Sequence, residues 1–349
     1  MPRFLLILGC AFFTSLVYSQ INSQNSVTGD SLDYYLFQSF LVADSQQRIS
    51  LNHIGIQGKQ LETGFLVTAV LEGYPAHTIG LNRGDVITSV NGEPFHSVNT
   101  FNIERDSNGA FASFTQEHQL TFQRNDTTVE VSVLPVFENL FDSYRSATSN
   151  SVLEFSAGNK TIGYIRFWAL SRGTNDLINY QKLIASLDHC DGIILDLRNS
   201  FGYLDSQHLD LVFNDKDNYF IVTEPPGQDY DFADLSPNLS FENYRKPIAL
   251  LLNEDTRGGT ELFAHQLAKL QRVITIGSAT AGKIGKFRIK SDFAAAPIEY
   301  QPATEVFIDG ILFEGLGIEP DLSVRFPYET TTRGDPQYDA AVNALLGII

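Results

Sequence analysis

The chain has 349 residues and carries 24 lysines and arginines against 41 aspartates and glutamates, which gives a formal net charge of −17. Such a charge argues against nucleic acid or an anionic membrane surface as a general partner, because both would repel the protein. Cys190 is the only cysteine beyond Cys10, so the body of the chain can form no internal disulfide. A chain of this length can bury a sizeable core, and two domains are expected.

The N-terminus has the pattern of a secretory signal peptide. A short basic start precedes an apolar run from Phe4 to Tyr18, and small residues occupy the −3 and −1 positions of a cleavage site after Ser19. We therefore expect a signal peptide over residues 1–19 and a periplasmic or extracellular protein. The alternative is a lipoprotein signal with Cys10 as the anchor, but its apolar segment would be only about six residues long. A retained membrane anchor is disfavoured, because the run is shorter than the roughly 20 residues that a span needs.

Residues 48–137 have the pattern of a small β-rich domain. Before it, residues 20–47 form a polar lead-in that contains an amphipathic piece from Leu32 to Val42. Alternation of apolar and polar residues, with turn signals at Asn91-Gly92 and Asn125-Asp126, predicts short strands. These strands span residues 53–56, 64–70, 85–90, 119–123 and 128–133.

Three motifs between these strands resemble those of PDZ domains in bacterial proteases. Pro75-Ala76 begins a short helix, a Gly-Leu-x-x-Gly-Asp turn runs from Gly80 to Asp85, and Val90-Asn91-Gly92 marks a hairpin. The resemblance implies capture of an extended peptide by strand addition, with its terminal carboxylate held by backbone N–H groups. No peptide sequence can be read from these motifs.

The PDZ resemblance also implies which residues bind the peptide. The carboxylate-binding loop would consist of Asn52, His53, Ile54 and Gly55. Selection of the peptide's side chains would come from the helix between Ala76 and Ile79.

Residues 150–349 alternate strand and helix patterns, which predicts an α/β domain with a mostly parallel sheet. The expected strands span residues 161–167, 191–197, 247–252 and 272–276. The expected helices span residues 175–187 and 260–269, and a closing helix begins near Asp335.

Four motifs in this domain resemble the C-terminal processing (tail-specific) protease family. They are Ile162–Arg166, Asp196–Asn199, Thr256–Glu261 and Gly315–Asp321. With the PDZ motifs included, the resemblance covers roughly residues 48–349. It implies a crotonase-like α/β core and a serine nucleophile, three residues before a glutamate, activated by a lysine about 25 positions further on. Peptides or protein C-terminal tails would be the partners, with no cofactor.

This chain departs from that pattern at the nucleophile. Gly258 stands three residues before Glu261, and Lys283 follows Gly258 by 25 positions, so the family's spacing is kept without its hydroxyl. The nearest hydroxyls belong to Thr256 and Thr260, but two helical positions turn a side chain by roughly 200°. Thr256 is interpreted as a turn residue and Thr260 as a helix cap. Thr260 as a nucleophile remains the alternative.

A serine/lysine hydrolase needs a neutral lysine in an apolar setting and backbone donors for the oxyanion. We expect Lys283 to occupy the base position, with Lys286 as its rival three residues out of register. Gly202 would lie in the oxyanion region, but Tyr203 replaces the second glycine of the family pattern. The loop has therefore either moved or filled the pocket with the tyrosine ring.

Two functions compete on this reading. One is a pseudo-protease that captures peptide tails; the other is an active peptidase with an unusual nucleophile. Free N–H groups at Gly258-Gly259 could also hold a peptide carboxylate without cutting it. A crotonase-type acyl-CoA enzyme is disfavoured by the signal peptide and the PDZ motifs.

No metal site is predicted from the sequence. The histidines lack paired metal-ligand spacing, and His189 beside Cys190 is isolated from any second pair. The acidic stretch with Glu224, Asp229, Asp231 and Asp234 is interpreted as a solvated loop.

Overall fold

The computed structural model describes residues 26–107, 109–113, 115–213, 222–223, 229–230, 243–290, 296–304, 307–308, 311–328 and 334–349. The predicted signal peptide lies outside these residues, as do the side chains of the predicted acidic loop. Among the described residues, no helix combines the length and the apolar character that a membrane span requires.

The N-terminal segment forms a short strand and a buried helix. Strand β1 (Ser26–Val27) precedes helix α2 (Leu32–Leu41), and a 3-10 turn, η1 (Ser45–Gln47), follows. Ser31 caps α2, because its hydroxyl accepts a hydrogen bond from the Asp33 N–H at 3.2 Å. The middle of α2, from Tyr34 to Phe40, is buried. The amphipathic piece expected at 32–42 is thus a helix, and it packs into the body of the molecule.

A six-stranded antiparallel sheet forms the smaller domain, in the order β3-β4-β5-β7-β8 with β6 paired to β5. Its strands are β3 (Ile56–Leu61), β4 (Gly64–Val70), β5 (Val86–Val90), β6 (Glu93–Pro94), β7 (His118–Arg124) and β8 (Thr127–Val133). Helix α3 (Pro75–Thr78) lies between β4 and β5 in the chain, and β2 (Leu51–His53) pairs separately with β9 (Val136–Glu138). Strand β3 is therefore an edge strand.

The strand expected at 53–56 is wrong. Gly55 has a φ of +79°, a conformation that favours glycine and breaks the extended chain. His53 and Ile56 consequently belong to different strands, β2 and β3, and β3 continues to Leu61.

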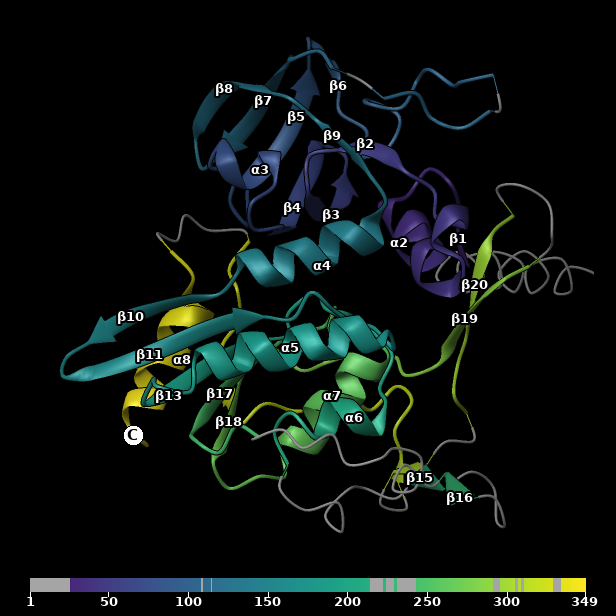
Figure 1. Ribbon diagram of the computed structural model, residues 1–349. Coiled ribbons are helices and arrows are strands. Elements are labelled where there is room, and N and C mark those ends of the chain that lie inside the picture. The colour runs from purple at the N-terminus through teal and green to yellow at the C-terminus, as the bar shows by residue number, and fades with distance from the viewer. Residues whose placement is uncertain are drawn as a thin grey trace, which may run out of the picture.

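Helix α4 (Leu140–Asn150) was not expected from the sequence, and it lies between the two domains (Figure 1). Asn139 caps it by accepting the Asp142 N–H at 3.0 Å. Tyr144 on this helix is only 3% exposed and packs in a cluster that joins α2, the small sheet and the larger domain. The segment between the domains is therefore a packed element and not a free linker.

The larger domain is built on a six-stranded sheet in the order β10-β11-β13-β17-β18-β23. The strands are β10 (Leu153–Ala157), β11 (Lys160–Arg166), β13 (Gly192–Asp196), β17 (Ile248–Leu252), β18 (Val273–Gly277) and β23 (Leu322–Ser323). All neighbouring pairs are parallel except β10 and β11. The structure confirms the mostly parallel sheet.

Helices cover both faces of this sheet. Ile193 and Leu195 pack with the cluster that includes α5 (Thr174–Ser186) and α7 (Gly259–Leu267), whereas Ile194 between them packs against α8 (Pro336–Leu346). Successive strand residues point to opposite faces, so two covered faces require the continuous apolar run seen here.

One of the smaller sheets attaches the N-terminal segment to the larger domain, and another lies within the larger domain. Strand β1 pairs with β20 (Ile298–Gln301), which pairs with β19 (Lys286–Ile289), while β12 (Ala169–Leu170) pairs with β14 (Phe201–Gly202). The Phe37 ring of α2 stacks on Phe287 at a centroid distance of 3.8 Å and tilts against Phe201 at 4.9 Å. The remaining described elements are α6 (Ser206–Leu209), β15 (Val222–Thr223), β16 (Asp229–Tyr230), β21 (Phe307–Ile308) and β22 (Ile311–Leu312).

Candidate functional site

The structure brings together three positions that the sequence singled out. The Gly258 N–H donates to the Lys283 carbonyl at 2.7 Å. A Cβ built on Gly258 would lie 2.9 Å from the Gly202 carbonyl oxygen. The segments meet because Gly202 and Gly258 follow the carboxyl ends of β13 and β17, neighbouring parallel strands whose loops share one edge of the sheet.

Gly258 itself forms the N-cap of α7, with φ 65° and ψ −140°. Left-handed φ of this kind strains any residue with a side chain. The position makes a sharp turn from loop to helix, and it carries no group that could attack a carbonyl.

Neither neighbouring threonine presents a hydroxyl to this turn. Thr256 Oγ1 donates to the Leu197 carbonyl at 2.8 Å and is fully buried, as expected for a turn residue. Thr260 lies inside the helix, two residues after the N-cap, so its interpretation as the cap is wrong. Its hydroxyl is buried without a hydrogen-bond partner among the described residues.

The backbone that carries Lys283 is fixed by Glu261. The Glu261 carboxyl accepts the N–H groups of Gly282 and Lys283 at 2.7 and 2.8 Å. Burial raises the pKa of Glu261 to about 7, although these hydrogen bonds pull it downward. Glu261 therefore orders the lysine loop.

The Lys283 side chain itself is exposed. The apolar setting expected for a neutral lysine base is thus absent here, because the loop ends at the surface. The rival Lys286, on β19, is exposed as well.

Beside Gly202, the predicted oxyanion position, the backbone around Tyr203 packs against the start of α7. The Tyr203 N–H donates to the Leu170 carbonyl at 3.0 Å, and Tyr203 does not adopt positive φ. A Cβ built on Gly259 would lie 2.0 Å from the Leu204 nitrogen, so the backbone of 203–204 presses on the start of α7. The tyrosine ring lies 4.8 Å from the Arg172 guanidinium.

An ion pair that the sequence analysis missed borders this site. Arg257 contacts the Asp33 carboxylate of α2 at 3.1 and 3.2 Å. Burial raises the pKa of Asp33, but the charges of Arg257, Lys283 and Lys59 outweigh it, and the net shift is downward. The only feature of the sequence that could have pointed to this ion pair is the position of Arg257 directly before Gly258 and Gly259.

A cavity of about 550 Å³ runs between the edge strand β3 and this ion pair. Its lining includes Ile56 to Gln60 of β3, the segment Pro94 to Ser97, α4 residues and both members of the Asp33–Arg257 pair. Gly258, Gly202 and Lys283 are not part of the lining. The cavity therefore borders Arg257, the neighbour of Gly258, without including Gly258 in its lining.

The helix expected to select peptide side chains does not border this cavity. Ala76 is fully buried, its N–H donates to the Ile54 carbonyl at 2.8 Å, and neither Ala76 nor Ile79 is among the lining residues. Helix α3 packs against the core of the small sheet instead. The segment Pro94 to Ser97 contributes to the lining together with β3.

The expected carboxylate loop is buried and largely satisfied internally. The Asn52 N–H donates to Asn102 Oδ1 at 2.7 Å, and the Gly55 N–H donates to His53 Nδ1 at 3.1 Å. The N–H of Ile54 has no acceptor among the described residues. His53 and Gly55 do line the cavity, so the loop lies beside it with fewer free donors than expected.

Burial holds His53 neutral, because it lowers the pKa of the imidazole to about 4. Its Nδ1 accepts the Gly55 N–H, so the proton resides on Nε2, which lies 3.1 Å from Ser143 Oγ. His53 thereby ties the loop to α4.

Gln57 connects the small sheet with the larger domain at the floor of the cavity. Its side-chain amide donates to the Tyr144 hydroxyl and, at 3.1 Å, to the Asn199 carbonyl. Asn199 follows β13, so one side chain of the edge strand reaches the loops of the α/β sheet. A ligand on β3 would therefore lie against both domains.

Comparison with known proteins gives the same two parts. The model of peptidase family S41 matches residues 161–324, and the PDZ domain model matches residues 52–134. A "Probable CtpA-like serine protease" of Staphylococcus aureus strain COL is 26% identical over 277 residues, which cover 78% of this chain and 53% of the relative. A protein of the same description from Staphylococcus haemolyticus is 24% identical over 287 residues, with the same coverage.

A solved structure from Bacteroides fragilis, described as an S41 protease, shares the fold at 18% identity and a TM-score of 0.55. The likeness covers 86% of this chain and 84% of that one. The chain spans about half the length of the curated relatives it matches. Residues 161–324 therefore match peptidase family S41 and residues 52–134 match the PDZ domain, and the chain is similar to CtpA-like proteases over both parts.

Proposed function

We propose that this protein is a pseudo-protease that binds peptide tails beside its PDZ domain without cleaving them. The observation that carries the proposal is Gly258 at the turn where the family's pattern places its serine. Neither neighbouring threonine hydroxyl replaces it, since one is bonded to a carbonyl and the other is buried in α7. The chemistry of acyl transfer begins with a nucleophile, and none is available at this turn.

Two further features support loss of hydrolysis. Lys283 is exposed, whereas the lysine of such a hydrolase lies in an apolar setting. The Tyr203 N–H is bonded to the Leu170 carbonyl and therefore cannot face an oxyanion. Base and oxyanion donor are thus deficient together with the nucleophile.

The cavity beside β3 suits an extended peptide. An edge strand offers unpaired N–H and C=O groups to an added strand, and the groove beside it offers room for alternate side chains. Lys59 lies in the lining with its side chain 53% exposed, 3.6 Å from Asp255 and 3.9 Å from Glu254, and a peptide carboxylate would compete with these two groups for its ammonium. The ligand class we propose is a peptide or protein C-terminal tail held by strand addition.

The proposal also includes the setting of this activity. The protein would act outside the cytoplasm after removal of residues 1–19, with the PDZ domain over residues 48–137 and a crotonase-like α/β domain over residues 150–349. The names of the staphylococcal relatives, serine proteases of the CtpA type, favour the alternative of an active peptidase with an unusual nucleophile. That alternative requires a nucleophile brought by movement of Thr260 or by another group.

Peptide titration tests the binding half of the proposal. Fluorescent peptides with free or amidated C-termini are titrated into the chain from residue 20 onward, and into Lys59→Gln and Lys290→Gln variants. Lys290 is a matched exposed lysine on another surface, paired with Glu299 at 2.6 Å. We expect free C-termini to bind more tightly, and Lys59→Gln alone to weaken them. If both peptide forms bind all three proteins equally, neither the peptide carboxylate nor Lys59 contributes to binding.

A further inference from the structure

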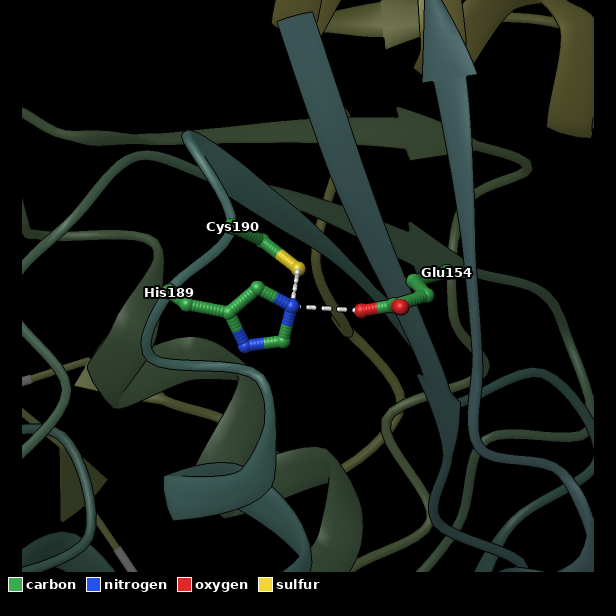
Figure 2. Close-up of side chains that lie close together, drawn as sticks. All are labelled: Glu154, His189 and Cys190. Atoms are coloured by element: carbon green, nitrogen blue, oxygen red, sulfur yellow. Dashed lines mark hydrogen bonds and ion pairs between the residues drawn. The ribbon is translucent and has the colours of Figure 1, made fainter.

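A second group of reactive side chains lies away from the cavity, at the β10 edge of the α/β sheet. Glu154 comes from the edge strand β10, and His189 and Cys190 come from the turn between α5 and β13. His189 Nε2 lies 2.5 Å from Glu154 Oε2 and 3.9 Å from Cys190 Sγ (Figure 2). One oxygen, one nitrogen and one sulfur thus lie within 4.8 Å of one another.

The arrangement does not fit a cysteine hydrolase. In such a triad the imidazole contacts the thiol with one ring nitrogen and the acid with the other. Here both partners face the same nitrogen, Nε2, as the two dashed lines in Figure 2 show. The thiol is also buried, which hinders attack on a substrate. Three donor atoms of these types within 4.8 Å of one another can instead share a metal ion.

We propose that Glu154, His189 and Cys190 form a three-ligand site for a divalent ion of the Zn²⁺ class, with solvent in the fourth position. Zn²⁺ binds thiolate, imidazole and carboxylate at bond lengths of roughly 2.0–2.3 Å. Tetrahedral bonds of these lengths place sulfur and nitrogen roughly 3.5 Å apart, and nitrogen and oxygen roughly 3.3 Å apart. The sulfur–nitrogen distance of 3.9 Å needs little change, and the exposed Glu154 can move outward by under about 1 Å.

The turn that holds two of the ligands is fixed by its own hydrogen bonds. The Cys190 N–H donates to the Leu187 carbonyl at 3.0 Å, and Lys246 Nζ donates to the carbonyls of Asp188 and, at 2.8 Å, of Cys190. Lys246 is thus engaged with backbone oxygens. A prepared turn reduces the entropy lost when an ion binds.

The approach of this turn to the sheet depends on Gly163. A Cβ built there would lie 3.1 Å from both the Leu187 and Ile193 side chains, so a larger residue would push the end of α5 outward. Gly163 is also the register partner of Glu154 on the neighbouring strand. The glycine therefore brings the turn within reach of the carboxylate.

An ion here would tie the edge strand β10 to the turn after α5. His189 and Glu154 have side chains 59% and 56% exposed, so an ion can enter from solvent and then displace the proton of the buried thiol. The consequence would be a stabilised edge of the sheet, independent of peptide binding.

The test uses the whole chain from residue 20 onward, with any affinity tag removed and metal stripped by chelator. Zn²⁺ is titrated by calorimetry, Co²⁺ is titrated by absorbance, and the melting temperature is measured with and without Zn²⁺. Variants Glu154→Gln and His189→Asn change exposed side chains and spare the core, and Cys190→Ser removes the sulfur. His77→Asn, an exposed histidine on α3, is the matched control.

We expect one Zn²⁺ per chain, a thiolate-to-Co²⁺ band in the near ultraviolet, and an upward melting shift of on the order of a few degrees at saturation. Each ligand variant should weaken binding by at least the roughly 10–100-fold that loss of an outer-shell partner costs, whereas His77→Asn should leave it unchanged. Unchanged affinity in Glu154→Gln and His189→Asn would overturn the proposal. So would absence of the thiolate band in wild-type protein, which would show binding to surface groups without the sulfur.

Discussion

Replacing Gly258 with serine restores the missing hydroxyl and tests how far the site has diverged. At Gly258 the new side chain meets φ 65° and the Gly202 carbonyl oxygen 2.9 Å from its Cβ. Strained backbone of this kind costs on the order of 1–3 kcal/mol, and the close contact places Gly258→Ser near the upper end, about 3 kcal/mol. Gly158 has the same φ of 65° with no atom within 4 Å of its Cβ, so Gly158→Ser reports the backbone strain alone, about 1–2 kcal/mol.

The measurement is urea unfolding of both variants, followed by hydrolysis of a fluorogenic peptide. Each missing oxyanion donor costs on the order of 10²–10³ in rate, so we expect only weak activity in Gly258→Ser. Combination with Tyr203→Gly, which frees the loop to approach the substrate, should give clearly more, and Lys283→Ala should abolish it. If Gly158→Ser and Gly258→Ser lower the free energy of unfolding equally, the contact with the Gly202 carbonyl adds no cost at position 258 and this reasoning is refuted. Full activity in Gly258→Ser alone would show that neither Tyr203 nor the exposure of Lys283 impairs hydrolysis.

Three further predictions concern stability, each measured by urea unfolding. In the folded protein the pKa of His53 is about 4, below its ordinary 6.5, so its contribution to the free energy of unfolding is complete above pH 6.5 and declines by about 3 kcal/mol as the pH falls towards 4. His53→Asn should lack this decline, and a variant with the wild-type pH profile would contradict the assignment. In the folded protein the pKa of Glu261 is about 7, above its ordinary 4.5, so the free energy of unfolding falls by about 3 kcal/mol as the pH rises from 4.5 to 7. Glu261→Gln should remove this fall, and a variant that still shows it would mean that another group titrates. Phe37→Ala should cost about 3–5 kcal/mol, because the ring is 1% exposed and stacked on Phe287; a cost under about 1 kcal/mol would mean that α2 is not part of the cooperative core.

Much of the fold follows from local patterns. Strand β4 has the bounds 64–70 that alternation predicts, and α5 starts and ends one residue before the expected 175–187. The sequence analysis did not predict helix α4, because its second half, from Arg145 to Asn150, is polar apart from one alanine and shows no repeating apolar face. Strand β3 was cut short because its outer half, from Gly58 to Leu61, is polar apart from its last residue and faces solvent.

The residues of the candidate site could be predicted from the sequence, but their exposure and their neighbours from distant segments could not. The resemblance to the C-terminal processing protease family implied that Gly258, Gly202 and Lys283 lie together, and the structure brings their backbones close to one another. Exposure of Lys283 could not be read from the sequence, because it depends on where the loop lies against the rest of the molecule. The Asp33–Arg257 pair joins residues 224 positions apart, a contact that only tertiary packing creates.

We propose that this chain binds peptide tails and does not cut them. One measurement addresses it directly: incubation of the wild-type chain from residue 20 onward with a diverse peptide mixture, with mass spectrometry of the free and bound peptides over time. The account predicts that peptides are retained intact, with no new termini above those in a no-protein control. New termini that accumulate with time and disappear in a Lys283→Ala variant would contradict it, and would show that the Gly258 site still supports hydrolysis.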